Sequence, residues 1–442
     1  MTETPDTIFA VASGAGKSAV AVVRLSGPDV RFALETMTGS IPQARRASLR
    51  AIRAELGGPV LDRGLVLWFP APGSFTGEDC AEFQLHGGRA IVAAVLQGLG
   101  SLPGLRAAEA GEFTRRAFLN GRLDLSQVEG LADLIDSETE LQRAQALRQF
   151  ERGLSGPVET WRSALVSASA LIEAEIDFTD ESDVPASTHA LVRGILAPVA
   201  KQIDEAIRRS GSAEALREGY CVMIAGPPNA GKSSLMNWIA RREVAIVSEH
   251  AGTTRDLIEI PLDIGGVPIS LVDSAGIRET TNPVEREGVE RAMKRARGAS
   301  LVLWLSDSDC TIPADFALPA KVAVLKIRTK SDLDGNFDGH FDFAISVFDG
   351  QGIDGLLQAI SGIAIHDLPA AGTAALTRTR HRIACQTASD ALQRVIGVKA
   401  DHDVVLIAED LRLAIRALGS LIGKVDVEEL LGEIFSRFCI GK

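Results

Sequence analysis

Residues 226–233 read GPPNAGKS and directly follow an apolar run at residues 220–225. They fit the pattern G-x-x-x-x-G-K-[ST], in which glycines let backbone N–H groups surround phosphate oxygens. A helical pattern at residues 234–240 adds the positive end of a helix dipole at the same point. Lys232 can reach the β- and γ-phosphates, and the Ser233 hydroxyl can bind Mg²⁺. The segment predicts a nucleoside triphosphate site whose contacts come from Asn229, Ala230, Gly231, Lys232, Ser233 and Ser234.

Two motifs downstream have residue types that can sense the γ-phosphate. The sequence DSAG at 273–276 follows the apolar run 269–272, so Asp273 can hold the Mg²⁺ shell and the Gly276 amide can meet the γ-phosphate. The sequence GTTRD at 252–256 lies between the phosphate loop and this strand. Its Thr254 suits a second Mg²⁺ contact that exists only while the γ-phosphate is present.

The base is indicated by the sequence TKSD at 329–332, which ends the apolar run 322–327. A carboxylate at Asp332 can accept from the N1–H and 2-amino groups of guanine, whereas adenine offers no such pair. Thr329 stands where Asn is usual, a change that should leave the choice of base unaltered, and Lys330 completes the loop. Ser346, after the strand pattern 343–345, closes the set. Five motifs in this order predict a Ras-like P-loop GTPase domain that binds GTP.

A second Gly-Lys-Ser sequence occurs at residues 16–18. Position 11 is Val, so the first glycine of a phosphate loop is missing there. We therefore expect no second nucleotide site in this part of the chain.

Length and composition limit the class of protein. A chain of 442 residues is too long for one hydrophobic core and should hold two to four domains. It has no apolar run near the roughly 20 residues that span a bilayer, and its first residues, MTETPDT, do not resemble an export signal. Five cysteines without C-x-x-C spacing favour reduced thiols, so we expect a cytoplasmic protein without a membrane segment. The net charge of −12 argues against broad, non-specific nucleic-acid binding.

The pattern of apolar residues divides the chain into four stretches. Residues 1–118 alternate short strands with turns, which predicts an α+β domain. Residues 119–218 have long helical periodicity, residues 219–367 carry the GTPase motifs, and residues 368–442 are helical again. The predicted fold class is therefore α/β plus all-α, with a GTPase domain inserted into a helical domain whose two parts pack together.

Four segments carry a resemblance to a known family: SFTGEDCAEFQLHGG at 74–88, GEFTRRAFLNGRLDLSQVEGLADLI at 111–135, GPPNAGKSSLMN at 226–237 and FCIGK at 438–442. Over essentially its full length the chain resembles the MnmE (TrmE) family of tRNA-modification GTPases. The resemblance implies an N-terminal domain of folate-binding type, a homodimer, and a heterotetramer with the FAD-binding subunit MnmG. It also implies a 5-carboxymethylaminomethyl- or aminomethyl-type substituent on the wobble uridine, position 34, of certain tRNAs.

The resemblance also assigns residues around the phosphates. Ser233 and Thr254 match the family's Mg²⁺ ligands, and Glu285 matches the residue that positions the attacking water. Ile277 follows Gly276, so the glutamine that orients water in Ras-like proteins is absent, and a K⁺ ion can supply the charge of an arginine finger. Without the resemblance, Glu285 reads as a solvated charge. The matched K⁺ ligands are Asn229, Ser248, His250 through its carbonyl, and Thr253.

For the folate, expected to be 5-formyl- or 5,10-methylene-tetrahydrofolate, the resemblance implies Arg24, Glu82, Arg122 and Lys442. A carboxylate can accept two hydrogen bonds from a pterin edge, and basic groups suit the glutamyl tail. The alternative for each residue is a surface ion pair. Position 122 is frequently Lys in the family, and residues 13–19 read SGAGKSA where the family usually has a sequence near PPGRGG.

Cys439 lies three residues before Lys442, in the terminal Cys-Ile-Gly-Lys sequence. The resemblance implies a role in the modification chemistry, near the folate, and a buried structural cysteine is the alternative. Two other function classes stay open for the whole chain. One is a ribosome-assembly GTPase, although no GXXG loop in a basic context is present. The other is a dimerisation-activated GTPase without modification chemistry.

Overall fold

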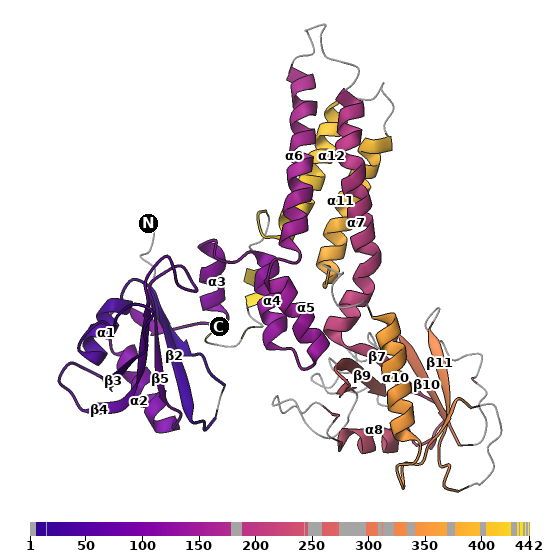
Figure 1. The fold of residues 1–442 in the computed structure, drawn as a ribbon, viewed down its shortest axis with the longest axis horizontal. Coiled ribbons are helices and arrows are strands. Elements are labelled where there is room, and N and C mark those ends of the chain that lie inside the picture. The colour runs from indigo at the N-terminus through magenta and orange to yellow at the C-terminus, as the bar shows by residue number, and fades with distance from the viewer. Residues whose placement is uncertain are drawn as a thin grey trace, which may run out of the picture. The chain divides into compact units, whose positions relative to one another are not determined.

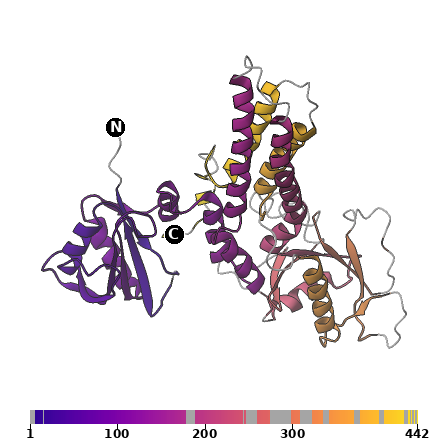
Figure 2. The ribbon, with the colours of Figure 1, turned by 45° about the horizontal axis from the view of Figure 1, so that its top comes forward.

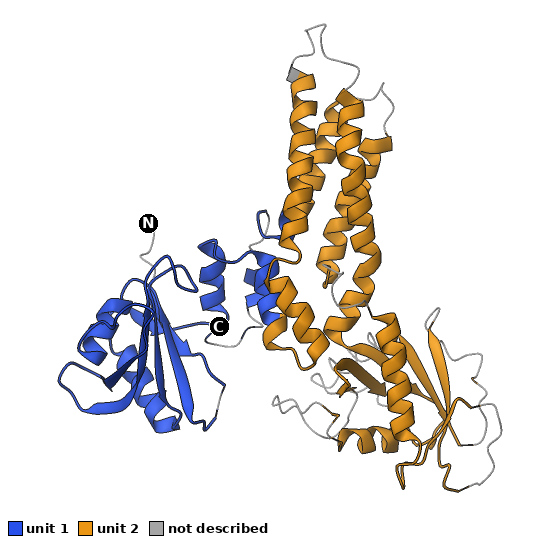
Figure 3. Cartoon of the chain, viewed as in Figure 1, with its two compact units in different colours: residues 1–132, 419–442 blue, residues 133–418 orange. Residues whose placement is uncertain are grey.

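The computed structural model describes residues 6–14, 16–177, 188–242, 244–245, 259–273, 298–307, 312, 322–333, 341–368, 376–397, 404–425, 431–432, 434–435, 438 and 441. The chain divides into two compact units (Figure 3), residues 1–132 with 419–442 and residues 133–418. Within the part that is described, no helix is both long and apolar enough to cross a membrane. The domain boundaries expected at 118, 218 and 367 stay predictions.

The first unit is built on a six-stranded mixed sheet with the order β3-β4-β5-β2-β1-β6. Alternate residues of its strands, such as Val23, Leu25, Phe83 and Leu85, are buried in one core cluster. This period of two sends the intervening side chains to the other face of the sheet. The elements are β1 (Thr7–Val11), β2 (Val20–Ser26), α1 (Val30–Thr38), β3 (Ser48–Arg53), β4 (Val60–Phe69), β5 (Cys80–His86), α2 (Arg89–Gly100) and β6 (Leu105–Ala107).

The rest of the first unit joins the chain's last residues to helices α3 (Glu112–Leu119) and α4, which runs over Leu125–Ile135. Phe435 and Phe438 form one apolar cluster with Leu125 and Val128 of α4. The two phenyl rings are tilted with their centroids 5.9 Å apart. The cluster ties residues far apart in sequence into one unit.

The second unit begins with a helical part whose segments come from both sides of the GTPase motifs. Helices α6 (Ser155–Asp177) and α7 (Thr188–Glu218) lie side by side with α11 (Thr379–Gly397) and α12 (Val404–Leu421) in both views (Figures 1 and 2). Ser389 on α11 donates to the Asp204 carboxylate on α7. The prediction that the two helical parts pack together is confirmed. A shorter helix, α5 (Glu140–Phe150), precedes α6.

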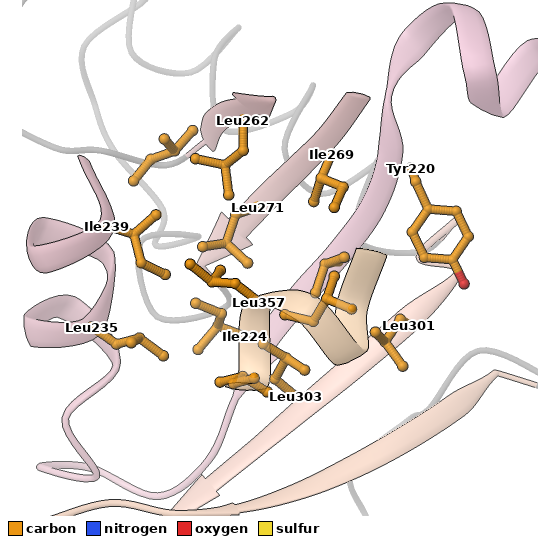
Figure 4. Packing of buried hydrophobic residues seen from close by; sticks show 14 of the residues in the cluster. Tyr220, Ile224, Leu235, Ile239, Leu262, Ile269, Leu271, Leu301, Leu303 and Leu357 are labelled. Atoms are coloured by element: carbon orange, nitrogen blue, oxygen red, sulfur yellow. The ribbon is translucent and has the colours of Figure 1, made fainter. Parts of the chain in front are cut away.

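The second sheet has the order β12-β11-β10-β7-β9-β8, and all of its strand pairs are parallel except β8 with β9. Strand β7 is buried on both faces: Val222 and Ile224 belong to one cluster (Figure 4), and Cys221 and Met223 to another. Such two-sided burial is typical of a parallel sheet covered by helices. The elements are β7 (Tyr220–Ala225), α8 (Lys232–Ala240), β8 (Glu259–Ile264), β9 (Val267–Asp273), β10 (Leu301–Ser306), β11 (Ala323–Arg328), β12 (Phe343–Ala344) and α10 (Ile353–Asp367).

Candidate functional site

The predicted phosphate loop lies at the carboxyl end of β7, whose neighbours in the sheet are β9 and β10. Ligands of open α/β sheets bind at this kind of edge. Gly226 has φ +147°, and a Cβ there would lie 2.0 Å from the Leu305 carbonyl oxygen, so the position requires glycine. Asn229 and Gly231 are also left-handed, at φ 64° and φ 83°. Gly231 then caps α8, which begins at Lys232.

Lys232 is 8% exposed, and its Nζ donates to the carbonyl oxygens of Gly226 and Pro227, each at 2.8 Å. Burial lowers the pKa of Lys232, while the nearby Asp273 charge acts in the opposite direction. The ammonium is therefore held inside the loop by backbone carbonyls.

The oxygen-bearing residues Ser233 and Asp273 suit a hard cation. Ser233 is exposed in the first turn of α8, and Asp273 is 5% exposed at the end of β9. Asp273 stands opposite Ile224 in the parallel β7–β9 ladder, so its carboxylate is at the same sheet edge as the phosphate loop. Hydroxyl and carboxylate oxygens are ligands that Mg²⁺ prefers. Ala230 is buried and Ser234 exposed.

Several expected phosphate-side residues lie outside the described residues. They are Ser248, His250, Thr253, Thr254, Gly276 and Glu285. Their predicted roles stay predictions, as does the set of K⁺ ligands.

The predicted base-reading loop follows β11. The Thr329 amide donates to the Ser306 carbonyl at 2.9 Å, which holds the start of the loop beside β10. Thr329 is 2% exposed, and its Oγ1 has no hydrogen-bond partner among the described residues. Lys330, at φ 56°, donates its Nζ to Asp307 at 2.6 Å, and Asp332 is exposed. The Asp332 carboxylate is therefore accessible to a ligand, and its role as the base reader stays a prediction.

Ser346 lies in a second loop that is hydrogen-bonded to the first. The Ser331 amide donates to the Ile345 carbonyl at 3.2 Å. Ser346 is fully buried, and its backbone closes a tight turn with Gly350 and Gln351. The structure thus brings the 329–332 and 346 motifs together at the carboxyl edge of the sheet, as their sequence order predicted.

In the first unit, Arg24 and Glu82 face each other across the β2–β5 ladder. The Arg24 Nε and Nη2 atoms donate to Glu82 Oε1 at 3.1 and 3.0 Å. Both of these hydrogen bonds end on Oε1, and among the described residues none donates to Glu82 Oε2. The Arg24 guanidinium also lies 5.6 Å from the Phe75 ring centroid and 5.9 Å from that of Phe113. The pair is an ion pair, as the alternative reading expected, but it leaves one carboxylate oxygen for a donor.

Arg122 reaches the loop that carries Phe75. A Cβ at Gly77 would lie 3.3 Å from the Arg122 Cγ, so the stem of this exposed arginine rests on the loop. The Asn120 side-chain amide donates to the Thr76 carbonyl at 2.8 Å. Arg24 and Arg122 therefore contact neighbouring residues of one loop.

The end of the chain returns to the first strand of the same unit. A Cβ at Gly441 would lie 2.1 Å from the Val11 carbonyl oxygen, so this glycine is packed directly against the end of β1. Cys439 and Lys442, on either side of Gly441, lie outside the described residues. Strand β1, on which Gly441 packs, pairs with the strand that holds Arg24.

The sequence reasoning missed a buried charged cluster in this unit. Glu112, 7% exposed, accepts from Arg106 at 2.6 Å and from Arg116 at 3.1 Å. Burial raises the pKa of Glu112, but hydrogen bonds from Arg106 and the Glu109 amide outweigh it and lower the pKa overall. Arg116 continues to Glu78 at 3.1 Å. The spacing of Glu112 and Arg116, four residues apart on a helix, is the signal that could have found it.

The Gly-Lys-Ser sequence at 16–18 lies in the connection between two antiparallel strands, β1 and β2. A phosphate loop instead joins a strand to a helix N-terminus. The structure agrees with the expectation that this segment forms no nucleotide site.

Comparisons with known proteins match the whole chain. The family profile described as "MnmE helical domain" matches residues 125–439, and "GTP-binding protein TrmE N-terminus" matches residues 7–122. The tRNA modification GTPase MnmE of Beijerinckia indica is 50% identical over 99% of this chain and 96% of that protein. The protein of the same name from Methylorubrum populi is 51% identical over 99% of this chain and 98% of that protein.

Among solved structures, the G domain of the T. maritima FeoB iron transporter covers 33% of this chain and 98% of that chain at 24% identity, with a TM-score of 0.22. A score this low carries no argument about fold or function. The family is shown by the full-length relatives and by the two profiles, which together span residues 7–439 except for 123 and 124. The chain belongs to the MnmE family of tRNA-modification GTPases.

Proposed function

We propose that this GTPase uses the hydrolysis of GTP in forming a 5-carboxymethylaminomethyl- or aminomethyl-type substituent on the wobble uridine of certain tRNAs, with a one-carbon folate as the carbon source. One observation carries the proposal: a chain of this family combines its GTPase motifs with a separate Arg24–Glu82 pair on the face of the first sheet opposite the α1–α2 core. That pair has aromatic rings beside it and an unused carboxylate oxygen. The two sites divide the work between phosphate chemistry and one-carbon chemistry.

At the phosphates, Lys232 would neutralise charge on the β- and γ-phosphates from its position inside the loop. Mg²⁺ would be held by Ser233 and Thr254, with Asp273 in its outer shell, and would stabilise charge that develops on the phosphate oxygens. Asn229, Ser248, His250 and Thr253 would hold K⁺ in place of an arginine finger. Glu285 would position the attacking water.

At the folate, Glu82 would accept from the pterin edge through Oε2 while Arg24 keeps its carboxylate in place through Oε1. Arg122 and Lys442 would attract the negative glutamyl tail. Cys439 would act in the modification chemistry itself, as the family resemblance implies. Gly441, two residues further on, packs against the end of β1 in the same unit as the Arg24–Glu82 pair.

The family resemblance supports a homodimer that assembles with the FAD-binding subunit MnmG and acts on tRNA in the cytoplasm. Because the chain has a net charge of −12, we expect the tRNA backbone to be bound by a more basic surface, either on the partner subunit or in a local patch of this chain.

The folate assignment is tested by titrating the full-length protein with 5-formyl-tetrahydrofolate in a calorimeter. Glu82→Gln keeps the size of the side chain but replaces an acceptor oxygen by a donor, so we expect at least about tenfold weaker folate binding, the loss of one charge-assisted hydrogen bond. Gln84→Ala, two residues along the same strand and on the same face, is the matched control and should bind as the parent does.

GDP affinity should be unchanged in both variants, because neither residue is near the phosphate loop in sequence or in the same compact unit. Equal folate affinity in the parent and in Glu82→Gln would remove Glu82 from the site. Loss of GDP binding together with folate binding would instead indicate misfolding.

A further inference from the structure

We propose that Leu141 and the glutamines of α5 are positioning residues for GTP hydrolysis, through which the nucleotide state is linked to the helices on either side of the GTPase domain. The proposal rests on the GTPase activity of the family and not on the folate or the partner. Helix α5 contacts the β8–β9 hairpin at one end. One face of α5 also contacts the two segments that connect the helical part to the GTPase domain: the end of α7, and the chain at Thr377 that leads into α11.

The β8–β9 hairpin lies between two predicted nucleotide-sensing motifs. It begins at Glu259, three residues after the GTTRD motif, and it ends at Asp273, the first residue of the DSAG motif. The hairpin turn is Gly265–Gly266, with φ values of 65° and 86°. A movement of either motif therefore pulls or pushes on the hairpin, because the hairpin is the next segment of the chain.

The turn of the hairpin touches the first turn of α5. The Leu141 amide donates to the Gly266 carbonyl at 3.3 Å. A Cβ at Gly266 would lie 3.6 Å from the Glu140 Cβ, which is ordinary van der Waals distance. The Leu141 side chain packs against the core cluster of the GTPase sheet. Helix α5 thus contributes an apolar side chain to the core of the GTPase sheet, to which the end of α7 also contributes Leu216.

One face of α5 carries three glutamines that hold the ends of the flanking helices. Gln142 Nε2 donates to the Arg217 carbonyl, and Gln145 Nε2 donates to the Ala213 carbonyl, both at 3.1 Å. Both carbonyls belong to the last turns of α7. Positions three apart lie on the same side of a helix, so these bonds act together.

The third glutamine contacts the segment through which the chain leaves the GTPase domain. Gln149 Oε1 accepts from the Thr377 hydroxyl at 2.8 Å, and both side chains are buried. The Arg217 Nε also donates to the Thr377 carbonyl at 2.9 Å, which joins the end of α7 directly to the chain that leads into α11. The chain's entry to the GTPase domain and its return are therefore held by the same short helix.

Close packing makes this contact a mechanical link. Protein interiors resist compression, so a shift of the hairpin turn should displace α5. The hydrogen bonds of Gln142, Gln145 and Gln149, of which the last two residues are buried, should pass the shift to α7 and to the chain that leads into α11. Coupling between two sites is reciprocal in free energy. A change in α5 should therefore alter how the hairpin places Asp273 at the phosphates.

The direct test is hydrogen exchange by mass spectrometry on the full-length protein loaded with GDP or with a non-hydrolysable GTP analogue. We expect peptides that cover residues 140–150 and 213–217 to differ in protection between the two states. Identical exchange of both peptides in the two nucleotide states would overturn the proposal, whatever any variant does.

A kinetic test uses two variants of α5. Leu141→Ala removes the packing against the GTPase core, and Gln145→Leu keeps the volume but removes the bond to the Ala213 carbonyl. We expect each to change kcat for GTP at least about fivefold, because a small misplacement of a group at the phosphates, caused by a change far from them, alters the rate strongly. GDP affinity should stay within about twofold, since no phosphate or base contact is touched.

The matched control is Arg143→Ala on the same helix. The Arg143 side chain is 48% exposed, and among the described residues its ion-pair partner is Glu140. This variant should leave kcat unchanged. Unchanged kcat in both Leu141→Ala and Gln145→Leu would contradict the positioning role. A parallel loss of GDP affinity would assign the residues to stability alone, which also overturns it.

Discussion

At the scale of single residues, the predicted contact to the base is the Asp332 carboxylate. This carboxylate is exposed at the carboxyl edge of the sheet, in a loop that is hydrogen-bonded to the Ser346 loop through Ser331 and Ile345. Asp332→Asn exchanges an acceptor oxygen for a donor, so two hydrogen bonds to the guanine edge of about 1.5 kcal/mol each are lost, or about a hundredfold in GTP affinity.

The same variant should gain affinity for XTP, whose base carries an oxygen where guanine has the 2-amino group. Competition of GTP and XTP for a fluorescent nucleotide measures both effects. Leu333→Ala, at an exposed neighbouring position in the same loop, is the control and should keep the parent's preference. If Asp332→Asn discriminates GTP from XTP as the parent does, another residue reads the base.

Asn229 is the residue on which the proposed cation depends. It is exposed and left-handed in the phosphate loop, next to the buried Ala230. Hydrolysis should be at least tenfold faster in K⁺ than in Na⁺ at equal ionic strength, because the ion supplies positive charge to the transition state. Asn229→Ala should erase most of that difference, whereas Asn237→Ala, on the exposed side of α8, should keep it. Phosphate release in the two salts is the measurement, and equal rates for the parent would remove K⁺ from the mechanism.

The loops that carry the predicted phosphate and base residues could be located from the sequence because their geometry is local. Gly226, Lys232 and Asp332 each lie in or beside a short loop whose backbone depends on its own glycines and on the strand before it. The contacts of α5 could not be predicted in this way. Gln149 and Thr377 are 228 residues apart, and a glutamine in a polar helix gives no sign of its partner.

At the scale of elements, four strands of the six-stranded GTPase sheet, β7, β9, β11 and β12, were expected close to their observed bounds. Strands β8 and β10 were not expected, and the first sheet was predicted only in part. Strand β7 was expected at 220–225 and has these bounds, because an apolar run buried on both faces is unambiguous. The edge strand β3 and the helices α1 and α2 were not expected. Strand β3 has only one fully buried residue, Ile52, so its alternation is weak.

A side-chain hydrogen bond joins the first strand of the GTPase domain to its last helix. Tyr220, at the start of β7, donates to Asp367, at the end of α10, with an O–O distance of 2.6 Å. The hydrogen bond from Tyr220 lowers the pKa of Asp367, although burial acts in the opposite direction. Burial raises the pKa of Tyr220. The Asp367 side chain is 44% exposed, so solvent screens part of the interaction. We expect Tyr220→Phe to cost about 1 kcal/mol near neutral pH.

The cost should depend on pH in one direction. The pKa of Asp367 is lower in the folded protein than in the unfolded chain, so its contribution is present above the unfolded value, about 3.9, and is lost as pH falls through the folded value. Thermal midpoints of the parent, Tyr220→Phe, Asp367→Asn and the double variant measure the coupling. A Tyr220→Phe effect that is the same at pH 3 and at pH 7 would contradict this assignment.

At the scale of the whole molecule, the proposed function combines two chemistries that should be separable. Gly441 packs on Val11 in the first unit, whereas the phosphate loop belongs to the second. Cys439→Ser should therefore leave GTP hydrolysis within about twofold of the parent, because no phosphate contact changes. Formation of the modified uridine in the presence of MnmG should fail. Full modification activity would make Cys439 a structural residue, and loss of both activities would point to misfolding.

The most direct measurement is tandem mass spectrometry of tRNA nucleosides from cells that lack this chain. The account predicts that the 5-substituted wobble uridines disappear, that the parent chain restores them, and that Lys232→Ala, which lacks the ammonium held in the phosphate loop, does not. Wobble uridines that stay fully modified without the chain, or that Lys232→Ala restores as well as the parent, would contradict a GTP-dependent role in tRNA modification.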